Sequence, residues 1–132
     1  MTFALSETSR LRLKGVHPDL IRVCERGIEI TPIDFRVTCG VRTIEEQKKL
    51  LAVGATTTLK SRHLLQSDGF AHAFDVVALL DGRARWDWPL YGKIADAMKL
   101  AAGECHVPIE WGGGWKNFPD GPHFQLPHGY VG

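Results

Sequence analysis

One ten-residue segment limits the folds open to this chain more than any other feature. Residues 71–80 read AHAFDVVALL, with a single carboxylate, Asp75, in a run of mainly apolar side chains. Because strand side chains alternate between faces, Asp75 shares a face with Val77, while His72 and Phe74 lie on the opposite one. Both faces are largely apolar, so we expect a strand that buries Asp75 at least in part. An ionised carboxylate in such a place needs backbone amides, an arginine or a metal ion as its partner.

Helices and shorter strands surround this segment. Apolar residues recur at helical spacing over 17–28, a second helix runs from an N-cap at Thr43 to Gly54, and a third opens at Asp87. Short strands are predicted over 35–39, 108–111 and 123–126. The elements do not alternate regularly, which favours an α+β fold with a small, mainly antiparallel sheet packed with about three helices. Near the N-terminus, Arg10, Arg12 and Lys14 alternate with leucines and predict a solvated edge strand.

Length, charge and cysteine content narrow the class of protein. The 132 residues predict one domain spanning residues 1–132, and a net charge of +1 gives no reason to expect nucleic acid as a partner. No apolar run approaches the roughly 18 residues of a membrane span, and the first residues lack a signal-peptide core. We therefore expect no membrane insertion and no export signal. Cys24, Cys39 and Cys105 form no CxxC pair and are expected to be reduced thiols that pack as small apolar side chains.

Two of the six histidines are candidates to accompany Asp75 in a metal site. His63 lies in Ser-Arg-His and His123 in Asp-Gly-Pro-His, whereas the others are expected in turns, at a helix end or on the opposite face of the strand. Two histidines and one aspartate from separate segments would leave the fourth position of a zinc ion open, which is the arrangement of catalytic zinc. The chain contains no local motif such as HExxH, so spacing alone also allows a structural role.

A second carboxylate precedes His123 by three residues. Asp120 is separated from it by Gly121 and Pro122, and this bend could bring both side chains to one metal ion. A zinc-bound water needs a base to take its proton, and Asp120 is a candidate. The alternative is an ordinary surface turn of the Pro-Asp-Gly-Pro type. Glu110 is a rival for the role of base.

Three segments together resemble a known family of enzymes. FRVTCGVRTIEEQKKLLAVGA, SRHLLQSDGFAHAFDVVAL and IEWGGGWKNFPDGPHFQL are similar to the phage L-alanyl-D-glutamate endopeptidases, which belong to the D-alanyl-D-alanine carboxypeptidase-like zinc peptidases. The resemblance covers nearly the whole chain. It implies zinc on His63, Asp75 and His123, with Asp120 as the base. It also implies that Arg42 stabilises the oxyanion and that Gln47 and Ser61 contact the substrate.

The resemblance further implies a role in lysis. A monomeric endolysin of this kind would cut the L-Ala–D-Glu bond of peptidoglycan, acting on the wall from the host cytoplasm with the help of a holin-type partner. A D-Ala-D-Ala carboxypeptidase or dipeptidase with the same zinc site is the alternative enzyme. A non-enzymatic wall-binding module with structural zinc is the alternative of another class.

The chain departs from the family pattern in one respect. Many members place the aspartate seven residues after the histidine, whereas His63 and Asp75 are twelve apart. The extra residues, around Gln66 to Gly69, are expected to lengthen the loop before the strand, and they leave His72 as a rival ligand.

Overall fold

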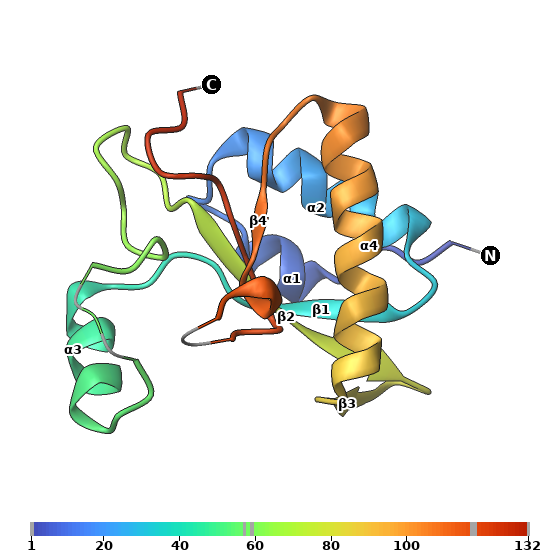
Figure 1. Ribbon diagram of the computed structural model, residues 1–132, viewed down its shortest axis with the longest axis horizontal. Helices are drawn as coiled ribbons and strands as arrows, with labels where there is room; N and C mark the ends of the chain where they lie inside the picture. The colour runs from blue at the N-terminus through green and yellow to red at the C-terminus, as the bar shows by residue number, and fades with distance from the viewer. Residues whose placement is uncertain (1, 57, 59, 117–118, 132) are drawn as a thin grey trace.

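The computed structural model describes residues 2–56, 58, 60–116 and 119–131. Within these ranges the helices are α1 (Glu7–Arg12), α2 (Pro18–Ile30), α3 (Ile44–Ala52) and α4 (Trp88–Cys105), and Gly112–Gly114 form a short 3-10 turn, η1. The strands are β1 (Asp34–Cys39), β2 (Ala73–Leu80), β3 (Arg83–Arg85), β4 (Glu110–Trp111) and β5 (His123–Gln125). Every strand pairing is antiparallel, which confirms the predicted α+β class (Figure 1).

The predicted central strand is β2, which begins two residues later than expected. The sheet order is β1-β2-β5-β4, and β3 also pairs with β2. Since β1 pairs with β2 from Asp75 to Leu79, β5 and β3 share the other edge of β2, one after the other. Asp75 is paired with Cys39 of β1 on one side and with His123 of β5 on the other.

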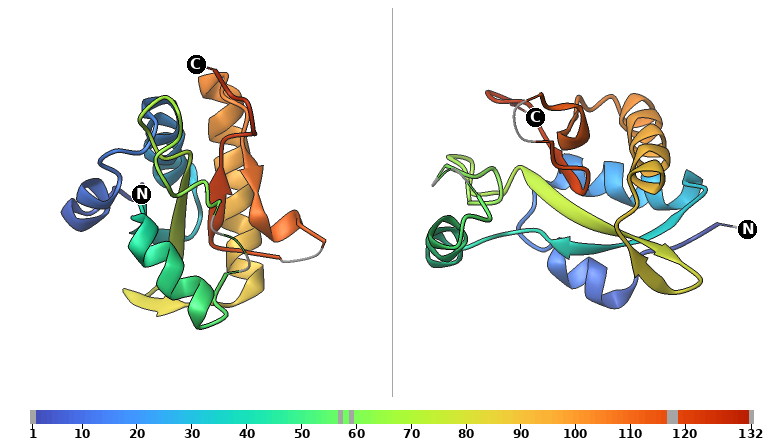
Figure 2. Two further views of the ribbon diagram at one scale, coloured as in Figure 1. Left: turned by 90° about the vertical axis from the view of Figure 1, so that its left-hand side faces the viewer. Right: turned by 60° about the horizontal axis from the view of Figure 1, so that its bottom comes forward.

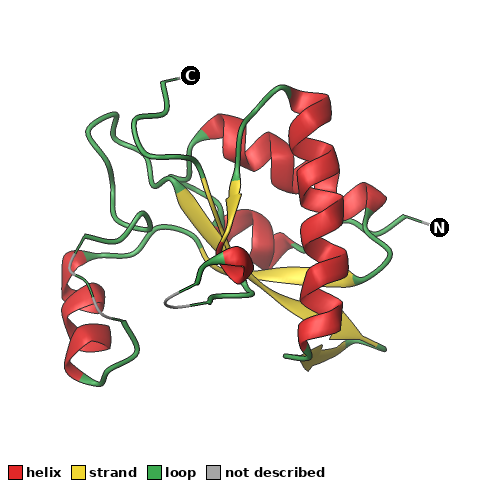
Figure 3. Ribbon diagram, viewed as in Figure 1, coloured by secondary structure: helices red, strands yellow, loops and turns green. Residues whose placement is uncertain are grey.

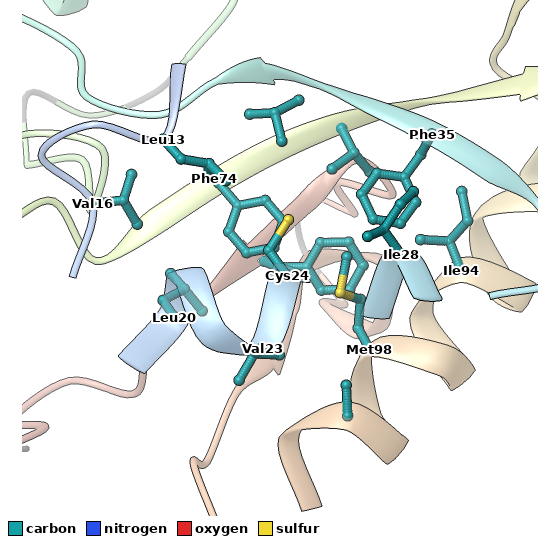
Figure 4. Packing of buried hydrophobic residues seen from close by; sticks show 14 of the residues in the cluster. Leu13, Val16, Leu20, Val23, Cys24, Ile28, Phe35, Phe74, Ile94 and Met98 are labelled. Carbon is teal, nitrogen blue, oxygen red and sulfur yellow. The ribbon is translucent and has the colours of Figure 1, made fainter. Parts of the chain in front are cut away.

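One face of the sheet is buried and the other carries the polar side chains. Helices α2 and α4 lie side by side on the buried face, whereas α3 stands apart from them (Figure 2). Phe74 of β2 stacks on Phe124 of β5, with ring centroids 5.6 Å apart. Both rings belong to the buried cluster of Figure 4, where Phe74 is seen together with Val23 and Cys24 of α2 and Met98 of α4. Alternation along β2 therefore directs Asp75 to the opposite face, as predicted.

The expected N-terminal edge strand was wrong, because residues 7–12 form the helix α1. Ser6 caps this helix by accepting a 3.1 Å hydrogen bond from the Ser9 backbone N–H. Two α1 side chains then bind the free edge of β1. The Val37 N–H donates to Ser9 Oγ at 2.9 Å, and Arg12 donates to the Val37 carbonyl at 2.9 Å. Helix side chains thus occupy the backbone groups that an added strand would have paired.

The other helices begin where their sequence signals place them. Both bonds of the Thr43–Glu46 capping box form, at 3.1 and 3.0 Å. Helix α4 has Asp87 as its N-cap residue and ends at His106, which adopts the left-handed conformation with φ 57°. None of the helices in the described ranges combines the length and apolar character that a bilayer span requires. A long loop follows α3 and another segment without helix or strand follows η1, and these segments carry much of the site (Figure 3).

Candidate metal centre and active site

Three of the candidate side chains, Asp75, His63 and His123, meet on the polar face of the sheet. Asp75 and His123 are brought together by the register of β2 and β5, in which they are direct partners. His63 comes from the loop after α3, and its carbonyl accepts a 2.8 Å bond from the Arg42 N–H. His63 and His123 are almost fully buried, and Asp75 is partly buried.

The three side chains present one atom each to a common centre. His63 Nε2 lies 3.2 Å from Asp75 Oδ1 and 3.2 Å from His123 Nδ1, and the last two atoms are 3.0 Å apart. Ligands about 2.0–2.1 Å from a tetrahedral zinc ion lie roughly 3.3 Å from one another. The triangle therefore has nearly the size that three zinc ligands require, and two imidazoles with one carboxylate are a donor set that zinc accepts.

Hydrogen bonds behind the triangle orient both imidazoles. His63 Nδ1 lies 2.8 Å from the Gly40 carbonyl, so this nitrogen is a donor, and Nε2, which faces Asp75, is the nitrogen that can bind a metal ion once its proton is released. His123 Nε2 donates to Gln125 Oε1 at 2.8 Å, because the Gln125 amide nitrogen is directed to Glu110 at 2.9 Å. Such bonds fix the tautomer of a metal-binding histidine.

Cys39 lies beside this centre and was not foreseen there. Its thiol is free, as are those of Cys24 and Cys105, which agrees with the prediction of reduced cysteines. Cys39, His63 and Asp75 together could also hold a cation. However, Cys39 Sγ lies 3.7 Å from His63 Nδ1, the nitrogen already bonded to Gly40, whereas His123 lies on the Nε2 side. The two-histidine set is therefore the better metal site.

The Asp-Gly-Pro-His bend places Asp120 at the same centre. A carboxylate oxygen of Asp120 and ligand atoms of Asp75 and His123 all lie within 4.8 Å of one another. The bend is held against η1, where the Asp120 N–H donates to the Gly112 carbonyl at 2.8 Å. A methyl group on Gly112 would come within 2.5 Å of the Asp120 carbonyl and 3.1 Å of His123 Cβ, so only glycine allows this approach.

The charges at the centre shift the ionisation of its members. Burial lowers the pKa of His63, but bonds to Asp75 and Cys39 outweigh that effect and raise it to about 10. Burial acts to raise the pKa of Asp75, and the bonds from His123 and His63 reverse this and hold it well below its usual range. The pKa of Asp120 is raised, first by burial and then by the charge of Asp75.

Arg42 lies at the centre, and Gln47 supports it from behind. The guanidinium of Arg42 is 3.9 Å from Asp75 and donates to Gln47 Oε1 at 2.8 Å. Gln47 is fully buried, and its amide nitrogen donates to the Thr58 carbonyl at 2.7 Å. Ser61 lines the cleft, and its hydroxyl accepts the His63 N–H at 3.1 Å. The structure therefore brings Arg42 and Ser61 to the cleft and Gln47 to a position beneath Arg42.

His72 lies away from the triangle, as strand alternation predicts. Its Nε2 is 2.7 Å from Asp68 Oδ2, and its Nδ1 accepts from Arg62 at 3.0 Å. Both ring nitrogens are thus bonded within the lengthened loop and its flanks. The ring also packs edge-on against His17, at 5.5 Å between centroids. These contacts give His72 a part in holding the loop.

A cleft of about 390 Å³ opens over the centre. Leu50, Ala55 and Lys60 line it together with Trp115, whose ring centroid is 5.2 Å from that of His123. Sequence reasoning did not single out Cys39, Gln125, Lys60 or Trp115. Only Gln125 had a signal that could have found it, because i and i+2 on a strand share a face and His123 was already a candidate.

Comparisons with known proteins identify one family of peptidases. Residues 1–126 match the family model described as phage L-alanyl-D-glutamate peptidase. The chain is 26% identical over 120 residues to the L-alanyl-D-glutamate peptidase of Escherichia phage T5, covering 88% of this chain and 84% of that protein. It is 34% identical over 98 residues to the L-alanyl-D-glutamate peptidase of Listeria phage A118, covering 74% of this chain and 32% of that protein. The crystal structure of Serratia marcescens L-Ala D-Glu endopeptidase ChiX matches with a TM-score of 0.84 and 43% identity, covering 92% of this chain and 87% of that one.

Proposed function

Because the chain belongs to the phage L-alanyl-D-glutamate peptidase family, we propose that it is a zinc-dependent endopeptidase that hydrolyses the L-Ala–D-Glu bond of peptidoglycan stem peptides. The observation that carries this proposal is the triangle of His63, Asp75 and His123, which has the size of a zinc site. Its three protein ligands leave a fourth position for water or substrate, as in catalytic zinc sites.

The surrounding side chains supply the other functions that amide hydrolysis needs. Zinc held by His63, Asp75 and His123 would polarise the scissile carbonyl and acidify a water molecule. Asp120 takes the proton of that water and returns it to the leaving amine. Arg42 stabilises the negative charge that develops on the carbonyl oxygen.

The supporting residues act through these groups. Gln47 orients the guanidinium of Arg42. The Gln47 side chain is buried, and its amide is bonded to Arg42 through the oxygen and to the Thr58 carbonyl through the nitrogen. Ser61 holds the turn that presents His63 and, because it lines the cleft, also remains a substrate contact in this proposal. The raised pKa of Asp120 makes its carboxylate a stronger base, which suits it to take a proton from the water.

The lytic role forms part of the same proposal. We infer an endolysin that acts as a monomer, resides in the host cytoplasm before lysis, and reaches the periplasm and cell wall with a holin-type partner. This inference rests on family membership. A D-Ala-D-Ala carboxypeptidase or dipeptidase would use the same zinc and the same base. A wall-binding module with structural zinc would need a fourth protein ligand, for which Asp120 is the nearest carboxylate.

Digestion of purified peptidoglycan, followed by mass spectrometry of the new termini, tests the reaction. We expect new L-Ala carboxyl and D-Glu amino termini. Release of D-Ala or D-Ala-D-Ala alone would assign the chain to the alternative enzyme, and no cleavage by zinc-loaded protein would favour the module.

Elemental analysis of the purified protein tests the metal site. We expect one zinc ion per chain, with His63→Ala and His123→Ala losing it and His72→Ala retaining it. His72→Ala is the matched control, because its imidazole is bonded to Asp68 and Arg62 rather than to the triangle. Loss of zinc from His72→Ala alone would mean that the lengthened loop supplies the ligand.

A further inference from the structure

Two tryptophans are unusually exposed on this molecule. The side chains of Trp86 and Trp88 are 68% and 52% accessible, and they flank Asp87 at the start of α4. Exposed aromatic rings of this size cost free energy in water and commonly mark a binding surface. The core does not need them, since neither belongs to the buried cluster.

The tryptophans lie beside the metal-binding turn. On one edge of β2, Ala78 pairs with Arg85 of β3, and the Val76 N–H donates to the Pro122 carbonyl at 3.0 Å. The segment that follows β3 and the segment that precedes β5 therefore lie next to each other along this edge of β2. The contact is direct, because a methyl group placed on Gly121 would lie 3.3 Å from the Trp88 ring. Gly121 directly follows Asp120.

The face of the sheet is also shared. Ala84 pairs with Leu79, and side chains at 75, 77 and 79 point to one face of β2. Ala84 therefore lies on the face that carries Asp75, two residues before Trp86. The segment that carries Trp86 leaves β3 next to this face.

The charges of the segment that carries the two rings balance. Arg83 and Arg85 are exposed, and so are Asp81 and Asp87, which leaves residues 81–88 without net charge. Arg85 and Asp87 form a 2.6 Å ion pair with about half of each side chain exposed. An anionic membrane or nucleic acid would require an excess of basic residues here. Aromatic faces next to neutral sets of donors and acceptors instead suit a sugar, whose C–H groups pack on the ring while its hydroxyls form hydrogen bonds.

The substrate places a sugar at this distance. In peptidoglycan the L-Ala nitrogen is joined to the lactyl group of N-acetylmuramic acid, so the scissile bond is one residue from the glycan. One extended residue spans roughly 3.3–3.6 Å, and a muramic acid ring must therefore lie close to the metal centre. Its carboxyl group is used in the amide, so the glycan is uncharged at this point.

We propose that Trp86 and Trp88 form a glycan-binding subsite that holds the polysaccharide strand while the adjoining stem peptide occupies the cleft. The inference rests on the proposed function, because only a bond next to the sugar requires such a subsite. A second copy of this chain on the same surface is the competing occupant.

Cleavage of two substrates by one variant separates these possibilities. The substrates are the free peptide L-Ala-D-Glu-meso-diaminopimelate-D-Ala and the same peptide attached to GlcNAc-MurNAc. For Trp86→Ala we expect kcat/KM to fall about five- to tenfold on the glycan-bearing substrate, through KM, and to stay within about twofold on the free peptide. Trp86→Phe should recover much of the loss. Leu100→Ala, which removes an equally exposed apolar side chain elsewhere on α4, is the matched control.

A binding measurement that needs no catalysis completes the test. Chitotetraose should change the tryptophan fluorescence of the wild-type protein, and the change should be lost in Trp86→Ala. Equal effects of Trp86→Ala on both substrates, or no effect on either, would overturn the subsite. A concentration-dependent dimer that Trp86→Ala abolishes, without a substrate difference, would assign the surface to self-association. If wild-type protein cuts neither substrate but still binds chitotetraose through Trp86, the proposed function fails while the sugar site stands.

Discussion

His123 donates its Nε2 hydrogen to Gln125 Oε1 at 2.8 Å, and that bond turns Nδ1 towards Asp75. Glu110 fixes the orientation of the Gln125 amide by accepting from its nitrogen at 2.9 Å. The carboxylate that rivals Asp120 as the base, Glu110, is therefore already engaged behind a proposed zinc ligand. Glu110, Gln125 and His123 form a chain that leads to the metal centre from the sheet.

The first prediction concerns this chain. Gln125→Leu removes the acceptor that fixes the His123 tautomer, and zinc affinity should fall roughly 10–100-fold. Competition with a chromophoric chelator measures the affinity. Thr38→Ala, an exposed change on β1, serves as the control and should bind zinc normally. Unchanged affinity in Gln125→Leu would show that the bond does not control the metal site.

The base is tested by two carboxylate-to-amide variants. Asp120→Asn should keep its fold and its zinc, because Asp120 is not a ligand in the proposed site, while turnover falls by roughly 10²–10⁴. Glu110→Gln should cost less, because it weakens only the hydrogen bond that orients Gln125. Zinc content and initial rates on peptidoglycan are measured for both. An active Asp120→Asn together with an inactive Glu110→Gln would reverse the assignment.

Two glycines of η1 provide a matched pair. A methyl group on Gly112 would collide with the Asp120 backbone, whereas one on Gly114 would meet nothing within 4 Å. Gly112→Ala should therefore displace the Asp120–His123 bend and lower both zinc affinity and turnover, and Gly114→Ala should change neither. Similar behaviour of the two variants would mean that the bend tolerates movement of η1.

Zinc binding should release a proton from His63. Burial lowers the pKa of this imidazole, but the bond to Asp75 prevails and raises it from 6.5 to about 10 in the metal-free protein. Below that pH a zinc ion must displace the proton, so the apparent affinity should fall about tenfold for each unit that the pH is lowered. Calorimetry at pH 7 in buffers of different ionisation enthalpy should show about one proton released. No dependence on buffer would contradict this.

The same ion pair affects the metal-free fold in a defined direction. A histidine whose pKa is raised on folding stabilises the folded state fully below its unfolded pKa, here 6.5, and loses that contribution as the pH rises through about 10. The melting temperature of the zinc-free protein should therefore decrease as the pH is raised from 6.5 to about 10.

The helix that replaces the expected edge strand can be tested independently of the site. Ser9→Ala leaves the buried Val37 N–H without an acceptor, and the free energy of unfolding should fall by about 1–3 kcal/mol. Thr8→Ala, at an exposed position of α1, is the control. Denaturant titration gives both values, and turnover at low denaturant should be unchanged.

Much of the secondary structure followed from local signals. The capping residues of α3, the apolar stripe of α4 and the apolar run of β2 each act within one segment, and the predicted helices and strand were confirmed. The prediction of a strand in the N-terminal segment was wrong because alternation of basic residues with leucines fits a strand as well as a short helix. Its state was decided by bonds from Ser9 and Arg12 to Val37, which lies 25 or more residues away. Strand β3 has only three residues and depends on its pairing with β2.

The sequence by itself determined which side chains could form the site. A carboxylate in an apolar strand needs a partner, and the segments that resemble a zinc peptidase family supply two histidines and a second carboxylate. What it left open was which atoms meet. Which of these side chains come into contact depends on the pairing between β2 and β5, the approach of η1 to Asp120, and the loop that carries His63. His123 is 60 positions from His63 and 48 from Asp75 in the sequence, so no local pattern encodes its contacts with them. Only the folded sheet decides that His63 Nε2 faces Asp75 and His123, that Gln47 lies beneath Arg42, and that the exposed Trp88 lies against the turn that carries Asp120.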